Sequence, residues 1–230
     1  MTPAVRIGMA IAVGTGLYGV SFGALAVAAG LSFWQAVALS ALLFSGGSQF
    51  AFVGVLAGGG SGAAALGASA LLGVRNSIYG MQLNALLRPP RSRRALAAHV
   101  TIDESTAVAG GQTDPQEQRR GFWTAGLGIF ILWNLFTAVG ALAGEAMGDP
   151  RAWGLDGAAV AAFLALLWPR LKSGDAVAVA VAAAAATILT VPLIPPGLPI
   201  LVAGAVAVGA QLLLGRGSDD ASPAPEGETR

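Results

Sequence analysis

Apolar residues dominate the chain in long runs, and short polar or glycine- and proline-rich breaks separate these runs. From Ile7 to Val74 there is no Asp, Glu, Lys or Arg. A helix needs about 20 apolar residues to cross the roughly 30 Å hydrocarbon core of a bilayer, so this interval is long enough for more than one crossing. The pattern predicts an all-α, polytopic integral membrane bundle with about six or seven transmembrane segments.

The breaks delimit the predicted segments. Gly30 and Ser32 follow the first run, and Ser32 is a predicted helix N-cap. Pro89 and Pro90 end the third run, because proline cannot continue a helix. The apolar runs are 7–29, 35–56, 61–87, 122–143, 157–168, 176–194 and 198–214, with a shorter and less apolar segment at 95–111. The small-residue pairs Gly19/Gly23 and Gly140/Gly144 predict close helix packing.

The second run carries Ser45-Gly46-Gly47-Ser48-Gln49 near its middle. Paired glycines weaken a helix, and polar side chains at bilayer depth need partners. Two interpretations are open here. Either the helices pack closely and Ser48 and Gln49 bond locally, or the helix is unwound and presents its backbone and Gln49 to a substrate, as broken helices do in many secondary transporters.

Only 11% of the residues are charged, well below the roughly 25% of soluble domains. The arginines cluster in the loops between apolar runs, a pattern that indicates which loops face the cytoplasm. It argues against nucleic acid as a partner. If 95–111 is a re-entrant or broken helix, the clusters at 88–94 and 119–120 lie on the cytoplasmic side with Arg170, Lys172 and Arg216. Arg6 and Arg151 are then left outside. We predict one transmembrane domain over 1–215 and a disordered cytoplasmic tail over 216–230.

One arginine lies inside an apolar run. Arg75 is the only charged residue between 61 and 87, and a charge at membrane depth persists only where it faces protein, water or a ligand. Helical rise puts Arg75 about 20 Å from Arg88, and Asp103 about 14 Å from Arg94, so the two charges approach similar depths. The sequence therefore predicts an ion pair of Arg75 with Asp103 or Glu104, which either locks helices together or serves transport.

The sequence lacks the residues that several kinds of catalytic and metal site require. The chain has no Cys and one histidine, His99, so no metal site or cofactor is expected. The glycine-rich stretch 58–62 is not followed by the Lys-Ser/Thr of a phosphate-binding loop, and no zinc-protease or serine-hydrolase motif occurs. We expect no enzyme, and we keep a non-transporting scaffold or assembly subunit as the alternative to a transporter.

A set of short motifs, in order along the chain, resembles the AzlC family, the large subunit of two-component branched-chain amino acid exporters. The motifs are Phe22-Gly23-x-x-Ala26, Gly30-Leu31-Ser32-x-x-Gln35-Ala36, Ser48-Gln49-Phe50, Arg75-Asn76-x-x-Tyr79-Gly80, Asp103-Glu104-Ser105, Ala165-Leu166-Leu167-Trp168-Pro169 and Gly197-Leu198-Pro199. Two positions depart from the family pattern. Asn76 and Ser77 stand where many relatives carry a His, and Ile102 stands where a hydroxyl residue is common.

The resemblance implies a multi-pass protein of a bacterial-type cell membrane that exports Leu, Ile and Val, with Met as a further candidate. It also implies an ion gradient as the driving force and a small AzlD-like membrane subunit as partner. The implied substrate-binding residues are Ser48, Gln49, Arg75, Asn76 and Tyr79. Without the family histidine, Asp103 and Glu104 are the candidates for carrying the coupling proton.

Overall fold

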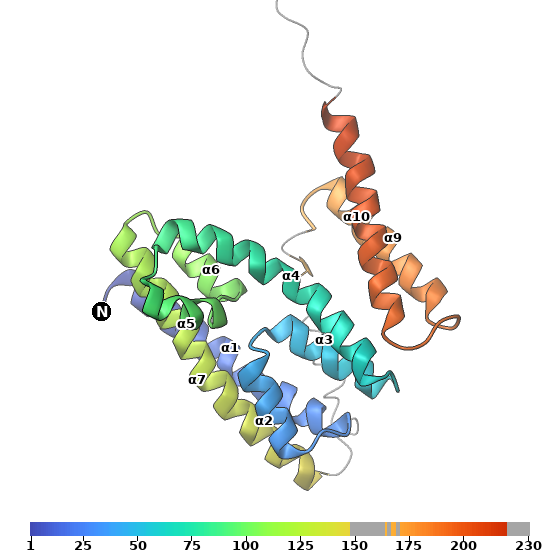
Figure 1. Cartoon of the computed structure of the whole chain (residues 1–230), viewed down its shortest axis with the longest axis horizontal. Helices are drawn as coiled ribbons and strands as arrows, with labels where there is room; N and C mark the ends of the chain where they lie inside the picture. The colour runs from blue at the N-terminus through green and yellow to red at the C-terminus, as the bar shows by residue number, and fades with distance from the viewer. Residues whose placement is uncertain (148–163, 165–166, 169–170, 220–230) are drawn as a thin grey trace, which may run out of the picture. The chain divides into compact units, whose positions relative to one another are not determined.

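The computed structural model describes residues 1–147, 164, 167–168 and 171–219 (Figure 1). Every regular element in these ranges is a helix. The contacts divide the chain into two compact units, Met1–Phe163 and Leu164–Arg230, each of which is described by itself. The predicted all-α class is confirmed.

Two long helices, α1 (Pro3–Ala28) and α7 (Pro115–Met147), lie side by side in the first unit (Figure 1). Glycines let their backbones touch: a Cβ on Gly19 would lie 2.7 Å from the carbonyl oxygen of Trp133. Residue numbers rise together along the interface, so the two helices are parallel. The facing pairs are Gly8 with Ala125, Gly16 with Leu132, Gly19 with Trp133, Gly23 with Thr137, Gly140 with Val20, and Gly144 with Ala24.

The second apolar run is two half-helices, α2 (Phe33–Leu42) and α3 (Gly46–Ala57), with a break between them. α2 begins at the predicted cap: Ser32 Oγ accepts a hydrogen bond from the Gln35 N–H, and Gln35 Oε1 accepts one from the Ser32 N–H. The helix is thus broken at residues 43–45, directly before the paired glycines that predicted a weakness, and these glycines begin α3.

α4 (Gly62–Leu87) runs antiparallel to α7. Ser61 caps its start by accepting a hydrogen bond from the Ala64 N–H. At its other end Arg88 is in the left-handed region with φ 46°, and Arg119 Nε donates to the Leu87 carbonyl oxygen at 3.2 Å. The C-terminal end of α4 therefore lies beside the start of α7. At 26 residues, α4 is about 39 Å long.

The α2–α3 hairpin returns toward the end of the unit from which it starts. Ser40 hydrogen-bonds Thr137, and Phe44 packs on Phe130, so α2 runs antiparallel to α7. The start of α3 at Gly47 lies beside the middle of α4, and a short loop joins its end to the start of α4. The hairpin thus reaches half-way along the α1–α7 pair and turns back.

A second hairpin enters from the opposite end. It consists of η1 (Arg91–Arg93), α5 (Arg94–His99) and α6 (Asp103–Gly110). His99 packs on Phe130 at the inner end of α5, and Val108 of α6 lies beside Gly121 near the start of α7. α6 therefore leads back toward the end at which α5 begins, and the break predicted within 95–111 is present.

These two hairpins correct the predicted topology. If 35–56 were one crossing, Arg6 would lie at the opposite end from the arginine cluster at 88–94. In the structure, α1 and α4 are instead the two long helices before Arg88, because α2 and α3 turn back. Ala4 accordingly lies beside Gly121, so Arg6 is at the same end as Arg119. The N-terminal charge then agrees with the positive-inside pattern that it was expected to violate.

The second unit contains α9 (Gly174–Thr190) and α10 (Leu198–Asp219), which pack on each other. Ser173 caps α9 by accepting a hydrogen bond from the Ala176 N–H, and Gly197 adopts φ 95° in the connection between the helices. α10 continues through residues 216–219, the first part of the predicted tail. The apolar run at 157–168 and the motif ending at Pro169 lie mostly outside the described residues.

Among the described helices, α1 and α7 are long and apolar enough to cross a membrane by length and composition. α4 has the length but carries Arg75, Asn76, Gln82 and Asn84, so it is less apolar. The predicted total of six or seven spans and the single domain over 1–215 stay predictions.

We expect Gly23→Ala to lower the free energy of unfolding by about 1 to 3 kcal/mol, because the added methyl would overlap the Thr137 carbonyl oxygen in α7. Gly14→Ala is a matched control on the same helix, because Gly14 is exposed and no described atom lies within 4 Å of its added Cβ. Alanine also favours helix, so we expect no loss of stability there. Thermal unfolding of the purified protein in detergent measures both, and equal midpoints would refute the close α1–α7 contact.

Candidate functional site

An ion pair joins α4 to the start of α6 where the two hairpins approach each other. Arg75 Nη2 lies 2.7 Å from Asp103 Oδ2, and the side chains are 28% and 20% exposed. Tyr79, one turn after Arg75 on the same face of α4, donates its hydroxyl hydrogen to Asp103 Oδ1 at 2.8 Å. The predicted pairing of Arg75 with Asp103 is therefore present, and both carboxylate oxygens of Asp103 are engaged.

The first turn of α3 lies against the guanidinium group of Arg75. A Cβ on Gly47 would be 2.9 Å from Arg75 Nη2, so a larger residue at position 47 would displace the guanidinium or the backbone. The N-terminal N–H groups of a helix carry partial positive charge and have no partner within the helix. Arg75 and the start of α3 thus add positive potential at the same place, opposite the acidic first turn of α6.

Three buried polar atoms in this region have no hydrogen-bond partner among the described residues: Ser48 Oγ, Arg75 Nε and Asn76 Oδ1. Ser48 is fully buried in the first turn of α3, and its Oγ lies 3.5 Å from the position of a Cβ on Gly73 in α4. Buried polar groups in proteins are nearly always hydrogen-bonded. Unused donors and acceptors beside an arginine provide capacity for a small polar ligand.

Gln49, by contrast, uses its whole amide within the protein. Its Nε2 donates to the carbonyl oxygens of Ser40 at 3.1 Å and Leu43 at 2.9 Å, and its Oε1 accepts from Trp133 Nε1 at 2.9 Å. Ser40 lies in the last turn of α2 and Leu43 is its C-cap, and carbonyl groups at a helix end lose their helical partners. Gln49 therefore stabilises the break between α2 and α3, as in the local-bonding interpretation.

Ser105 has the corresponding role in the second hairpin. Its Oγ accepts from the Ile102 N–H at 3.0 Å and donates to the Val100 carbonyl oxygen at 2.8 Å. Ser105 is fully buried, so these bonds satisfy backbone groups that water does not reach. The bonds hold the turn that orients Asp103 toward α4.

Two further groups border the pair. Glu104 follows Asp103 in the first turn of α6, is partly buried, and forms no ion pair with any described residue. His99 at the end of α5 packs against Phe44 and Phe130, with ring centroids 6.0 Å and 5.4 Å away. Phe44 lies in the break of the first hairpin, so the inner ends of the two hairpins are in direct contact.

Of the seven predicted site residues, five lie together, whereas Gln49 is bonded within the α2–α3 break and Glu104 borders the ion pair. Arg75, Tyr79 and Asp103 are bonded to one another, and Ser48 and Asn76 lie nearby with unpartnered atoms. The interpretation of the sequence missed the role of one glycine and of two partner residues. Gly47 makes room for Arg75, Trp133 binds Gln49, and Ser105 orients Asp103. The paired glycines at 46–47 were a usable signal, whereas nothing near Trp133 in sequence indicates Gln49 as its partner.

Comparison with known proteins identifies one matching protein family. The sequence model of a family described as AzlC protein matches residues 10–147, which is more than half of the chain. The matched range contains both hairpins and every residue of the site described above. None of the curated proteins and none of the solved structures matches the chain significantly.

We expect Gln49→Met to destabilise the protein by about 1 to 3 kcal/mol. The substitution keeps side-chain volume but removes the bonds of the Trp133 N–H and the Ser40 carbonyl oxygen to the Gln49 amide, and it leaves the Leu43 carbonyl oxygen with only the Ser45 N–H. Gln82→Met on the exposed surface of α4 is the matched control and should be close to neutral. If thermal unfolding midpoints of the two variants are equal, the amide does not stabilise the break.

Proposed function

Because the chain belongs to the AzlC family, we propose that it is a secondary-active transporter that exports Leu, Ile and Val, with Met as a further candidate. Its family and its two long apolar helices mark it as a membrane protein. We further propose a multi-pass protein of the cell membrane with about six or seven spans and a small AzlD-like subunit as its partner.

The observation that carries the proposal is the position of Arg75. It lies half-way along the first unit, where a hairpin from each end terminates, and its guanidinium group is paired with a carboxylate that can be exchanged. A site that both ends of a protein approach through separate half-helices is suited to alternating access. Movement of one hairpin at a time would open the site to one side of the membrane.

An amino acid substrate offers a carboxylate that can replace Asp103 on Arg75. Guanidinium groups bind carboxylates through paired, charge-assisted hydrogen bonds. Ser48 Oγ and the N–H groups at the start of α3 can donate to the same carboxylate, while Asn76 Oδ1 can accept from the substrate ammonium group. Ser48 Oγ and Asn76 Oδ1 have no other partner among the described residues. The N–H groups at the start of α3 have no partner within the helix.

Displacement of Asp103 from Arg75 would couple substrate binding to proton uptake. A neighbouring guanidinium favours the ionised form of a carboxyl group, whereas a low-dielectric setting favours the protonated form. A carboxyl group that loses its arginine to the substrate therefore takes up a proton more readily. Tyr79 stays within reach of Asp103, and Glu104 is a second acceptor in the same helical turn. Substrate and proton would then move in linked steps.

Recognition of the substrate side chain would depend on the small residues of α3 and α4. Glycine and alanine leave space but offer few specific contacts, so discrimination between Leu, Ile and Val should be modest. One methylene in an apolar pocket changes the binding free energy by only about 1 to 3 kcal/mol. We propose no enzymatic step and no cofactor for this site.

Counterflow of labelled leucine in proteoliposomes, with the small partner subunit present, tests the function. We expect Arg75→Gln to abolish exchange, because it removes the carboxylate-binding group. We expect Asp103→Asn to retain exchange at a fixed pH but to lose efflux driven by a pH gradient, because an amide cannot carry the proton. Glu104→Gln shows which of the two acids is the carrier.

Expression level and unfolding midpoint separate this outcome from a structural role of the pair. A non-transporting scaffold would lose folded protein when Arg75 or Asp103 is changed, and the native protein would show no leucine exchange. Undiminished pH-driven efflux in both acid variants would refute proton coupling through this pair.

A matched pair of serines tests direct contact with the substrate. Ser48 and Ser69 are both fully buried, and each has an unpartnered hydroxyl group, but only Ser48 lies at the start of α3 beside Arg75. We expect Ser48→Ala to raise the KM for leucine about tenfold, because one hydrogen bond to a charged group contributes about 1.5 to 3 kcal/mol. Ser69→Ala should leave KM unchanged. Equal effects on KM would remove Ser48 from the binding site.

A further inference from the structure

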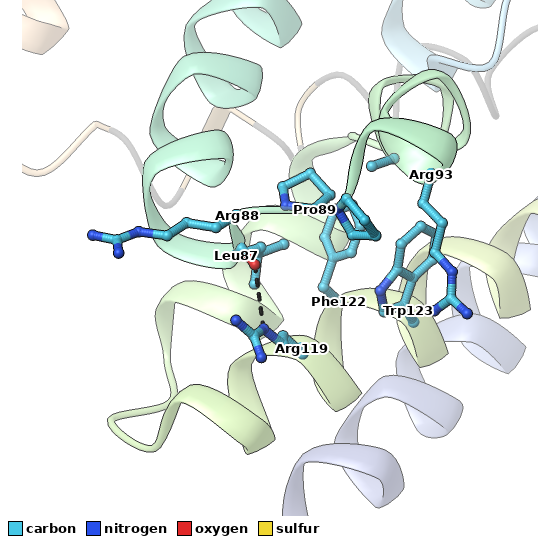
Figure 2. A pocket seen from close by; sticks show the side chains of 9 residues that line it. Leu87, Arg88, Pro89, Arg93, Arg119, Phe122 and Trp123 are labelled. Carbon is cyan, nitrogen blue, oxygen red and sulfur yellow. Dashed lines mark hydrogen bonds between the residues drawn. The ribbon is translucent and has the colours of Figure 1, made fainter.

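A small cavity lies at the end of the first unit where the N-terminus and the arginine cluster meet. Its volume is about 250 Å³, and residues from the end of α4, η1, α5 and the start of α7 line it (Figure 2). The lining consists of Leu87, Arg88, Pro89, Pro90, Arg93, Ala97, Arg119, Phe122 and Trp123. Three of these residues are arginines and none is acidic.

The arginines differ in how they face the cavity. Arg119 lies below Leu87 and donates its Nε hydrogen to the Leu87 carbonyl oxygen, while Arg93 lies beside Trp123 on the other side of Phe122 (Figure 2). Arg88 points away from the cavity (Figure 2). The bond from Nε fixes the guanidinium group of Arg119 and leaves its terminal N–H groups available. Arg93 and Arg119 are therefore the cationic groups of this site.

Neither charge is neutralised within the part of the chain that the structure describes. The ion pairs there are Arg75 with Asp103 and Arg120 with Glu117, and Arg93 and Arg119 belong to neither. Arg120 engages Glu117 at 2.7 Å, so the nearby carboxylate of α7 already has a partner. Both side chains are exposed, so their charges are accessible to an anion from the solvent or from a membrane surface.

The rest of the lining selects the kind of anion. Phe122, Leu87 and the two prolines form apolar walls, and Trp123 is a side chain typical of membrane interfaces. Guanidinium groups bind phosphate through paired hydrogen bonds. Basic pockets between helices at the cytoplasmic side of membrane proteins are suited to anionic headgroups. We infer that this cavity binds a phosphate group, from an anionic phospholipid or from a soluble phosphate, with Arg93 and Arg119 as its cationic groups on the two sides of Phe122.

The site is separate from the Arg75 site, and the inference does not rest on the transport function. Leu87 is 12 residues from Arg75 along α4, which corresponds to about 18 Å. A bound anion would join the end of α4 to the start of α7 across the loop that leads into the second hairpin. It would thereby stabilise this end of the unit.

Thermal unfolding of the purified full-length protein in non-ionic detergent tests the site. Short-chain phosphatidylglycerol, short-chain phosphatidylcholine and inorganic phosphate are titrated separately. Arg93→Gln is the test variant, and Arg91→Gln in the same turn, η1, is the matched control, because Arg91 does not line the cavity. We expect phosphatidylglycerol to raise the unfolding midpoint, and Arg93→Gln to weaken its half-saturation about fivefold while Arg91→Gln does not.

The three titrations distinguish the sources of the phosphate. Stabilisation by phosphatidylglycerol alone, lost in Arg93→Gln, identifies a lipid headgroup, and the same dependence with inorganic phosphate identifies a soluble anion. If Arg93→Gln and Arg91→Gln weaken binding equally, or if neither phosphatidylglycerol nor phosphate exceeds phosphatidylcholine, the arginines act only as diffuse surface charge and the inference is wrong. Arg119→Gln is a second variant, which should match Arg93→Gln wherever it folds.

Discussion

The ion pair between Arg75 and Asp103 is the interaction on which the arrangement of the first unit depends. A lone guanidinium group in an apolar helix is costly, and its carboxylate partner must come from another element at the same depth. The break before α6 puts an acidic helix start in position, and the glycine at position 47 lets α3 approach from the other side.

In both hairpins, buried polar side chains bond the backbone groups that the break leaves without helical partners. Breaking a helix leaves N–H and carbonyl groups unpaired, and in an apolar interior each such group is expensive. Gln49 satisfies the carbonyl groups at the end of α2, and Ser105 satisfies the N–H and carbonyl groups before α6. The breaks are therefore built features with their own hydrogen bonds. Ser48 Oγ and Asn76 Oδ1, near the ion pair, have no such bonds among the described residues.

The parallel pair α1 and α7 gives these hairpins a common frame. Glycines on both helices bring the backbones into contact, and the aromatic groups of Phe22, Phe50 and Trp133 pack where α3 meets the pair. Because the two helices are parallel, the chain between them must return to its starting end. One full-length return helix, α4, and two hairpins that turn back accomplish this. The same constraint gathers Arg6, the cluster at 88–94 and Arg119 at one end, where the basic cavity lies.

The amino-acid sequence by itself determined the helical class, most of the helix boundaries, the weakness at 45–49 and the presence of one arginine inside an apolar run. These are local properties, because apolar run length, proline, glycine and serine caps act within a few residues. It also determined the family, through motifs whose order is visible along the chain. The tertiary structure alone decided that α2 and α3 turn back, that α1 and α7 are parallel, and that Trp133 binds Gln49. The physical reason is that a broken helix can continue or reverse with the same local sequence, and contacts between residues more than 80 positions apart select the outcome.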